Sequence, residues 1–200
     1  MAYAVPRPVV EAFRKCPGPV LYLAGSFNPP HAGHLEALKS AAWQLRQRGH
    51  VEPPILVVAP KSDERLKKKM EGYGDTFMFP WSERVKLFQK LIQLEHCGEV
   101  HFDEAWRHFR GEATQIRRDT DRAFGALGCQ IFRVMGEDRV RDHGLEDDPW
   151  VLSTPRSKLS STGIRKLLAL GDGDGESADE LNALVGPKVA RVYMQSFATL

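Results

Sequence analysis

The chain has 200 residues, 42% of them hydrophobic, and its 28 basic and 26 acidic side chains leave a net charge of +2. This length suffices for one well-packed α/β domain and is too short for two of ordinary size. Because the charges nearly balance, nothing calls for nucleic acid or an anionic membrane as a partner, and phosphate chemistry has to come from local placement of charge.

The cysteines and the apolar runs exclude further classes. Cys16, Cys97 and Cys129 are odd in number and widely spaced, which argues against a disulfide framework and a structural zinc site. No apolar run approaches the roughly 18 to 20 residues of a membrane span, and prolines interrupt residues 1–19, which lack a signal-peptide core. We expect a cytoplasmic protein with an N-terminal arm (1–19), either packed or a short helix, and one domain over residues 20–200.

A strand, a tight loop and a helix are predicted near the start of that domain. Residues 20–24 are apolar, a turn rich in Asn and Pro follows, and leucines then recur at helical spacing as far as about Arg48. His31 and His34 lie three apart on one side of the helix start, where unpaired N–H groups favour phosphate. On these features alone, two unrelated surface histidines are the more common explanation.

The full string, Gly25-Ser26-Phe27-Asn28-Pro29-Pro30-His31-Ala32-Gly33-His34-Leu35, resembles the signature of the His-x-Gly-His nucleotidyltransferases. Among them it is most similar to the nicotinate or nicotinamide mononucleotide adenylyltransferases. In that family the first helix holds the ATP phosphates, and both histidines of the motif contact them. The resemblance implies that His31 and His34 are catalytic and that, with Gly25, Ser26 and Phe27, they bind ATP.

The second strand is predicted at residues 55–59, a continuous apolar run typical of a strand buried on both faces of a parallel sheet. The charged run 61–69 follows, and composition alone indicates a solvated loop or helix face. It leaves the edge of the sheet at which open α/β sheets bind ligands. It also looks like the lysine-bearing loop of the animal-type mononucleotide adenylyltransferases, which implies Lys67 and Lys68 as phosphate ligands.

The next predicted helix begins at Ser82, which we expect to cap it. Arg84 matches an arginine of the family, although a solvent-exposed salt-bridge residue explains it as well. Trp81 lies beside this helix start, and Trp106 follows a short third strand at residues 100–102. Both are candidates to hold the ring of the second substrate, although burial in the core is the commoner role of such aromatics.

The fourth strand, residues 130–135, follows a helix predicted at 114–127 and leads into Gly136-Glu137-Asp138. The family has a Gly-x-Asp here that contacts the ATP ribose and adjacent groups, which implies Gly136 and Asp138. Its more familiar members then carry tryptophans that hold the pyridine ring. This sequence departs from them, and we expect Arg139 and Arg141 to contact the acceptor instead.

After a fifth strand at residues 150–153, a helix opens with Ser160-Ser161-Thr162-Gly163-Ile164-Arg165. A generic capped helix begins similarly, because Ser and Thr favour N-caps. The string also matches the family's second signature, Ser-Ser-Thr-x-Ile-Arg. The resemblance implies that Ser160, Ser161 and Thr162 bind the triphosphate and that Arg165, a catalytic residue, clamps its oxygens. Residues 171–176 indicate a flexible loop rather than a calcium site, and residues 187–193 look like the family's closing helix.

We therefore expect an α/β fold: a single-domain, doubly wound, Rossmann-like parallel sheet with helices on both faces. The resemblance implies transfer of an adenylyl group from ATP to a pyridine mononucleotide, with Mg²⁺ bound through the ATP phosphates and no metal held by the protein. Nucleic acid and membrane are not expected as partners, and a homo-oligomer stays open. Three alternatives also stay open: another acceptor (such as phosphopantetheine) or CTP, a nucleotide-binding regulator without catalysis, and a nucleic-acid module resting on Lys67 to Lys69.

Overall fold

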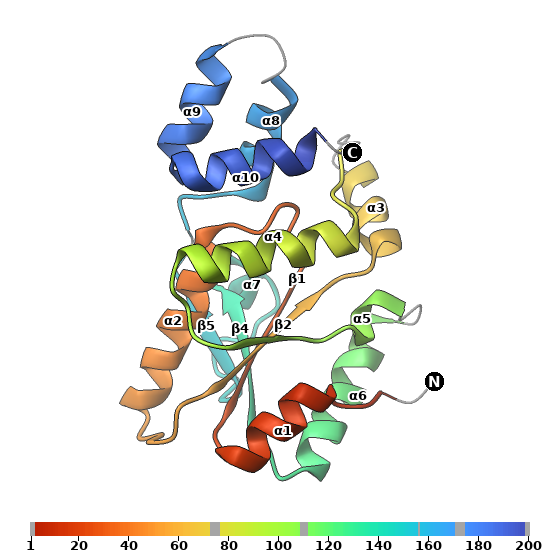
Figure 1. The fold of residues 1–200 in the computed structure, drawn as a ribbon. Coiled ribbons are helices and arrows are strands. Elements are labelled where there is room, and N and C mark those ends of the chain that lie inside the picture. Colours follow the sequence, from red (N-terminus) through yellow and green to blue (C-terminus); the bar gives the residue numbers. More distant parts are fainter. Residues whose placement is uncertain (1–2, 73–76, 109–111, 156, 171–174, 199–200) are drawn as a thin grey trace. The chain divides into compact units, whose positions relative to one another are not determined.

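Five parallel strands form one sheet in the computed structural model (Figure 1). They are β1 (Val20–Gly25), β2 (Ile55–Pro60), β3 (Val100–Phe102), β4 (Ile131–Gly136) and β5 (Val151–Thr154), in the order β3-β2-β1-β4-β5. The direction in which successive strands are added reverses between β1 and β4, as in a doubly wound sheet. The predicted strands and the Rossmann-like fold class are confirmed. In open sheets of this kind, ligands bind beyond the carboxyl ends of the strands at this reversal.

The structure describes residues 3–72, 77–108, 112–155, 157–170 and 175–198. Its helices are α1 (Arg7–Lys15), α2 (Ala32–Gln47), α3 (Asp63–Gly72), α4 (Trp81–Leu94), α5 (Ala105–His108), α6 (Ala113–Ala126), α7 (Glu137–Asp142), α8 (Ser161–Leu170), α9 (Gly175–Val185) and α10 (Pro187–Phe197). Of the expected loop at 171–176, residues 171–174 lie outside the described residues. No described helix has the length and apolar character needed to cross a membrane.

One helix start differs from the sequence prediction. Ser82 does not cap α4, because Pro80 occupies the N-cap position and Ser82 is an exposed residue of the first turn. The charged run after β2, which the sequence left open as a solvated loop or a helix face, is largely helical, and Ser62 Oγ accepts the backbone N–H of Arg65 at 3.3 Å at the start of α3.

The described chain divides into two compact units, each built from three stretches of sequence. The sheet unit comprises residues 1–25, 36–60 and 99–156, and the helical unit comprises residues 26–35, 61–98 and 157–200. The boundary falls directly after β1, so that both motif histidines belong to the helical unit. The expected division into an arm (1–19) and one domain (20–200) stays a prediction.

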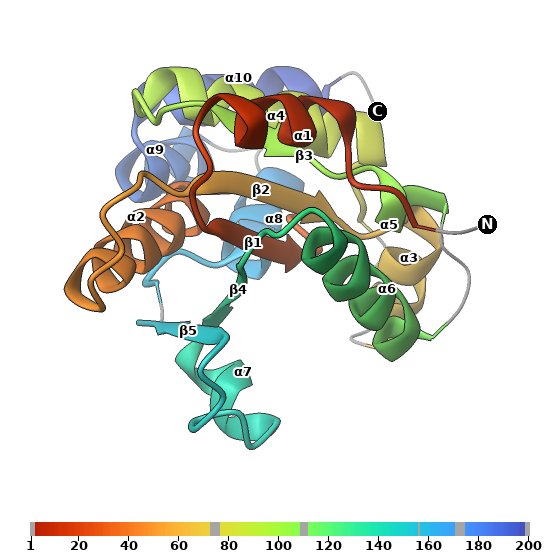
Figure 2. The same cartoon turned by 90° about the horizontal axis from the view of Figure 1, so that it is seen from below.

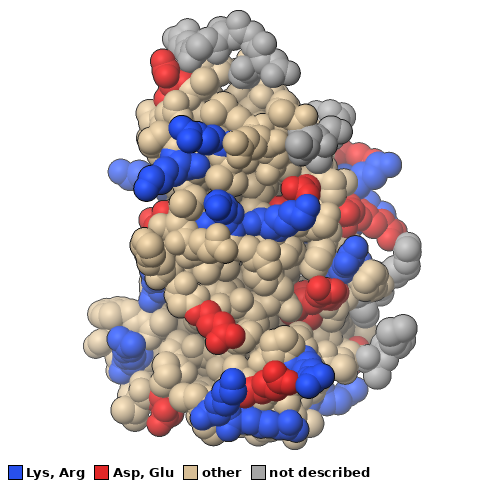
Figure 3. Space-filling view, in the orientation of Figure 1, with Lys and Arg blue, Asp and Glu red and all other residues tan. Residues whose placement is uncertain are grey.

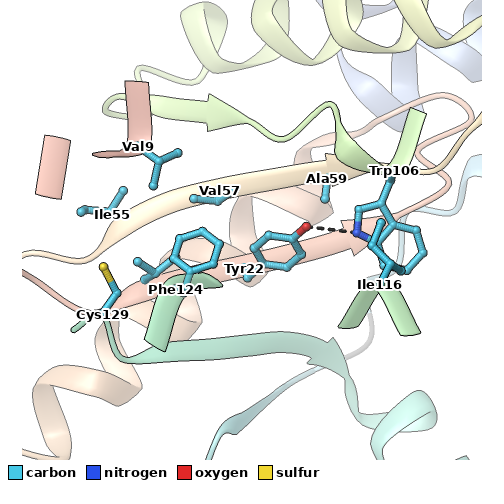
Figure 4. Close-up of a cluster of buried hydrophobic side chains, with 10 residues drawn as sticks. Val9, Tyr22, Ile55, Val57, Ala59, Trp106, Ile116, Phe124 and Cys129 are labelled. Atoms are coloured by element: carbon cyan, nitrogen blue, oxygen red, sulfur yellow. Dashed lines mark hydrogen bonds between the residues drawn. The ribbon is translucent and has the colours of Figure 1, made fainter. Parts of the chain in front are cut away.

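Both faces of the sheet are covered within the sheet unit. On one face, Tyr22 and Val57 pack with Phe124 of α6 in a buried cluster, which Figure 4 shows. On the other face, residues of α2 from Glu36 onward bury their leucines, and Gln44 Nε2 donates to the Ser153 carbonyl at 2.7 Å. Figure 2 shows α6 and α2 on opposite sides of the sheet. Alternate side chains of the strands thus meet apolar partners on both faces.

Trp106 belongs to the first of these faces. It lies in the short helix α5, is 2% exposed, and donates its indole N–H to the Tyr22 hydroxyl at 3.0 Å (Figure 4). The hydroxyls of Tyr22 and Tyr3 in turn donate to the buried carboxylate of Asp103. Burial raises the pKa of Asp103, and these hydrogen bonds oppose that rise. The indole therefore packs in the core and takes part in a satisfied polar network.

Candidate functional site

The β1–α2 loop, defined here as residues 26–31, is held by side chains that donate to its backbone carbonyls. The donors come from α4, α8 and α10 of the helical unit. Arg84 Nη1 donates to Ser26 at 2.6 Å, Arg165 Nη1 to Asn28 at 2.6 Å, Ser161 Oγ to Pro29 at 2.8 Å, and the Tyr193 hydroxyl to Pro30. Carbonyl oxygens repel anions, and here they already accept hydrogen bonds from the protein. The loop is thereby suited to an anionic ligand.

Asn28 fixes the centre of this loop. Its side chain is 1% exposed; Oδ1 accepts the N–H of Phe79 at 2.8 Å, and Nδ2 donates to the Phe77 carbonyl at 3.1 Å. An amide supplies a donor and an acceptor on one planar group, which neither a carboxylate nor an aliphatic side chain can do. Asn28 therefore joins the loop to the segment before α4.

Arg84 is a buried clamp rather than the exposed salt-bridge residue that the sequence left open. The side chain is fully buried, and besides Ser26 it donates to the carbonyls of Phe79 (3.0 Å) and Lys61 (2.8 Å) and to Asp63 (2.7 Å). Burial lowers the pKa of its guanidinium, and Asp63 opposes that shift. The planar guanidinium, which offers five N–H donors, thus ties the β1–α2 loop to both α3 and α4.

The two motif histidines stack on each other in the helical unit. Their ring centroids lie 3.8 Å apart, and the backbone N–H of His31 donates to His34 Nδ1 at 3.0 Å. His31 is 6% exposed, and its Nδ1 is buried with no hydrogen-bond partner among the described residues. Such an atom is costly to bury unless a ligand or water pairs with it.

Both imidazoles are held neutral at physiological pH. Burial lowers the pKa of His31 to about 4. Burial, together with the neighbouring His31, lowers the pKa of His34 well below its usual value. His34 Nδ1 lies 3.0 Å from the His31 N–H, from which it accepts, and 3.2 Å from the His31 carbonyl, to which only an Nδ1–H could donate. We assign the proton of neutral His34 to Nε2 on the shorter of these contacts. His34 therefore offers an Nε2–H donor without carrying a fixed charge.

Gly33 is required by the packing between the histidines. A Cβ at this position would lie 2.2 Å from Ser157 Oγ and 3.0 Å from His31 Nδ1. Two atoms that are not covalently bonded cannot come as close as 2.2 Å. Any residue with a Cβ at this position therefore has to displace Ser157 or the first turn of α2. This contact gives the small residue of the motif a steric cause.

The second signature meets the first within the helical unit. Ser160 Oγ accepts the N–H of Gly163 at 3.0 Å and caps α8, as in the generic capped helix that the sequence left open, and its contact with triphosphate stays a prediction. Ser161 and Arg165, which is 6% exposed, contact the β1–α2 loop, while Thr162 is exposed and accepts a hydrogen bond from Arg165 Nη2 at 3.4 Å. Sequence reasoning assigned both signatures to one phosphate site, and the structure brings them into direct contact.

The other predicted site residues are divided between the units. In the helical unit, Lys67 and Lys68 are exposed on α3, and Trp81 is 5% exposed. In the sheet unit, Gly25 ends β1, Gly136 ends β4, and Asp138, Arg139 and Arg141 are exposed on α7. The Asp138 carboxylate lies over Gly136, because a Cβ there would be 2.7 Å from Oδ1. Their contacts with ligand stay predictions.

The charged side chains on one face of the molecule carry both signs (Figure 3). On the face in Figure 3, basic and acidic side chains intermingle, as expected from a net charge of +2. In the part of the chain that the structure describes, no group of three or more His, Cys, Asp and Glu side chains is placed to hold a metal ion. The electrostatics of the site therefore depend on individual residues such as Arg165.

Comparison with known proteins identifies the protein family and the general class of reaction. The sequence profile of the cytidylyltransferase-like family matches residues 22–167, which run from within β1 through β5 and include both signatures. The chain belongs to the cytidylyltransferase-like family. Membership supports nucleotidyl transfer as the class of reaction and agrees with the parallel sheet. No curated protein matches the chain.

Proposed function

We propose that the protein transfers an adenylyl group from ATP to nicotinate or nicotinamide mononucleotide, releasing pyrophosphate. The observation that carries the proposal is the buried His31 Nδ1, which lacks a described partner beside the neutral His34. It lies in a loop whose carbonyls are occupied by Arg84, Ser161, Arg165 and Tyr193. This arrangement favours phosphate oxygens as the missing partners.

The chemistry needs positioning more than acid–base catalysis. The 5′-phosphate of the acceptor is ionised near neutral pH, so its oxygen can attack the α-phosphorus without a general base while the bond to pyrophosphate breaks. ATP enters with Mg²⁺ on its phosphates, and that ion supplies charge neutralisation as part of the substrate. The Nε2–H of His34 then donates to an oxygen on which charge builds, and Arg165 fixes the loop that presents the histidines.

The acceptor site is proposed around α7. Arg139 and Arg141 are exposed on this helix, directly after the Gly-x-Asp motif. Trp81 and Trp106 expose only 5% and 2% of their surfaces, so the arginines are better placed to reach a ligand in this conformation. Gly136 and Asp138 complete the proposal as contacts to the ATP ribose, because a carboxylate at a strand end can accept ribose hydroxyls.

One assay tests the proposal and its alternatives together. Pyrophosphate release is measured from ATP and from CTP with nicotinate mononucleotide, nicotinamide mononucleotide and phosphopantetheine. We expect release only with ATP and a pyridine mononucleotide. Release with CTP or phosphopantetheine would identify a different transferase, and tight ATP binding without release would identify a nucleotide-binding regulator.

A single substitution tests the catalytic role of His34. His34→Ala removes the Nε2–H donor, and we expect kcat to fall about 10²-fold with a much smaller change in ATP binding, because the donor acts mainly in the transition state. Lys39→Ala, which changes an exposed residue of the same helix, is the matched control. Unchanged turnover in a folded His34→Ala protein would leave His34 as a packing residue.

A further inference from the structure

The C-terminal helix α10 contacts the β1–α2 loop through the side chain of Tyr193. This tyrosine is fully buried, and its hydroxyl donates to the carbonyl of Pro30. It belongs to neither signature and lies outside the matched residues 22–167. Sequence reasoning found only a closing helix at this place, with no role for Tyr193. The contact links that helix to the residue directly before His31.

One peptide group connects this hydroxyl to His34. The carbonyl of Pro30 and the N–H of His31 are the two polar ends of the same planar peptide. That N–H donates to His34 Nδ1 at 3.0 Å. Tyr193, the Pro30–His31 peptide and His34 therefore form a continuous chain of hydrogen bonds. In such a chain each bond polarises the next, and a rotation of the peptide plane moves both of its ends.

The order of donors in this chain determines which nitrogen of His34 carries the proton. The same Nδ1 also lies 3.2 Å from the His31 carbonyl, to which it would donate in the Nδ1–H tautomer. The His31 N–H can only donate, and its hydrogen bond to Nδ1 favours the neutral ring with its proton on Nε2. The His34 ring is held on its other sides by His31, by the edge-on ring of Phe27 and by the tilted ring of Phe88, with centroid distances of 3.8, 4.9 and 6.2 Å. These rings restrict the angle of the imidazole but donate no hydrogen bond to Nδ1.

We propose that Tyr193 is a positioning residue, which acts through the Pro30–His31 peptide to keep His34 in its Nε2–H tautomer. Without the hydroxyl, the Pro30 carbonyl loses a buried donor and the peptide plane is freer to turn. The His31 N–H then points less directly at Nδ1, and the other tautomer becomes accessible. The tautomer depends on the fold alone, whereas its effect on turnover rests on the proposed function.

The first test needs no activity. In histidine labelled with ¹⁵N, the two ring nitrogens report the tautomer, and a His34→Gln spectrum identifies the His34 signals. We expect Tyr193→Phe, which removes only the hydroxyl, to shift these signals toward a mixture of tautomers. Replacing Tyr193 by 3-fluorotyrosine keeps the ring and the hydroxyl donor, so the His34 signals are expected to stay those of the Nε2–H tautomer.

Tyr22→Phe is the matched control. It also removes a buried phenol hydroxyl, one that donates to Asp103 and accepts from the Trp106 indole in the sheet unit rather than donating to the Pro30 carbonyl. Its His34 signals are expected to match those of the parent protein. Signals of His34 that stay unchanged in Tyr193→Phe, or that move equally in both variants, would overturn the proposal.

Kinetics give the second test. We expect Tyr193→Phe to lower kcat about tenfold while KM for ATP changes by less than about twofold, since the tautomer matters when charge develops in transfer. Tyr22→Phe should keep the parent kcat. If the parent protein releases no pyrophosphate, the proposed function fails, and the NMR result still decides the role of Tyr193.

Discussion

The guanidinium of Arg165 donates to the backbone carbonyl of Asn28 at 2.6 Å, so the second signature holds the first one directly. The conventional expectation for an arginine in such a string is contact with phosphate alone. Here the side chain is 6% exposed, and one of its Nη atoms donates a hydrogen bond to the β1–α2 loop. Any contact with a nucleotide is therefore made by a guanidinium that the protein has already oriented, which reduces the entropy lost on binding.

Arg165→Lys is expected to reduce kcat/KM about 10²-fold, or about 2.7 kcal/mol in transition-state stabilisation. An ammonium is a single point donor and cannot serve Asn28, Thr162 and a phosphate in the plane that a guanidinium spans. The measurement is steady-state kinetics with varied ATP. Lys166→Ala, at the exposed neighbouring position of α8, is the control and should retain the parent value. Equal kcat/KM in Arg165→Lys and the parent would remove Arg165 from the site.

Arg84→Met is expected to destabilise the protein by about 3 to 5 kcal/mol, because the fully buried guanidinium is lost and the carbonyls of Ser26, Lys61 and Phe79 lose its hydrogen bonds. Denaturant unfolding at neutral pH measures the change. Lys86→Met, which removes a cation that is 69% exposed on the same helix, should change the free energy of unfolding by less than about 0.5 kcal/mol. Similar small losses in both variants would show that the clamp contributes little.

Gly33→Ala is expected to cost about 1 to 3 kcal/mol, the usual range for overpacking, because the new Cβ meets Ser157 Oγ and Cβ at 2.2 and 2.5 Å. Ser157→Gly removes both of these atoms. The double variant should therefore recover most of the lost stability, giving a coupling energy that a double-mutant cycle measures. Additive losses in the double variant would contradict the contact between the two positions.

Acid should destabilise the protein through His31. The pKa of His31 falls from 6.5 to about 4 on folding. Between pH 6.5 and 4, His31 is therefore protonated in the unfolded chain but neutral in the folded chain. The stability that the neutral His31 ring contributes is fully present above pH 6.5 and is lost as the pH falls toward 4. The free energy of unfolding then decreases by at most about 1.4 kcal/mol per pH unit. His34, whose pKa burial also lowers, acts in the same direction.

Denaturant unfolding from pH 7 to 4 measures this slope. His31→Gln removes one titrating ring and should flatten the dependence by about one proton. A His31→Gln curve parallel to that of the parent protein would show that His31 is not kept neutral by the fold.

The sequence predicted the sheet well because strands buried on both faces carry an unmistakable apolar run, as in Ile55 to Pro60. The order of the two signatures also led to the prediction that they lie together, and Arg165 does contact the β1–α2 loop. A site shared by His31 and Arg165 stays a prediction. The sequence could not predict that Arg84 is fully buried or that Tyr193 reaches Pro30. Both the burial of Arg84 and the reach of Tyr193 depend on backbone carbonyls of the β1–α2 loop, and backbone carbonyls leave no pattern in the sequence. The prolines of the loop indicate only that it has few N–H donors to pair with these carbonyls.

The choice of acceptor gives the last prediction. Nicotinate and nicotinamide mononucleotides differ at one ring substituent, a carboxylate against a neutral amide, so discrimination requires donors alone for the first or a donor with an acceptor for the second. The exposed residues of α7 and its C-cap offer both kinds of group: Arg139 and Arg141 donate, and Asp142 accepts. Neither substrate is favoured decisively by this set.

We therefore expect the two mononucleotides to be used within about tenfold of each other in kcat/KM, a difference of about 1.4 kcal/mol. Arg139→Ala and Arg141→Ala should weaken the use of the nicotinate form more than that of the amide, because only the carboxylate gains charge-assisted hydrogen bonds from them. Lys158→Ala, at an exposed position of the helical unit, is the control. The measurement is steady-state kinetics with each mononucleotide at equal ATP and Mg²⁺. A preference of more than a hundredfold for either form would show that a dedicated polar group recognises the ring substituent. If both arginine variants kept that preference, the group would not lie on α7.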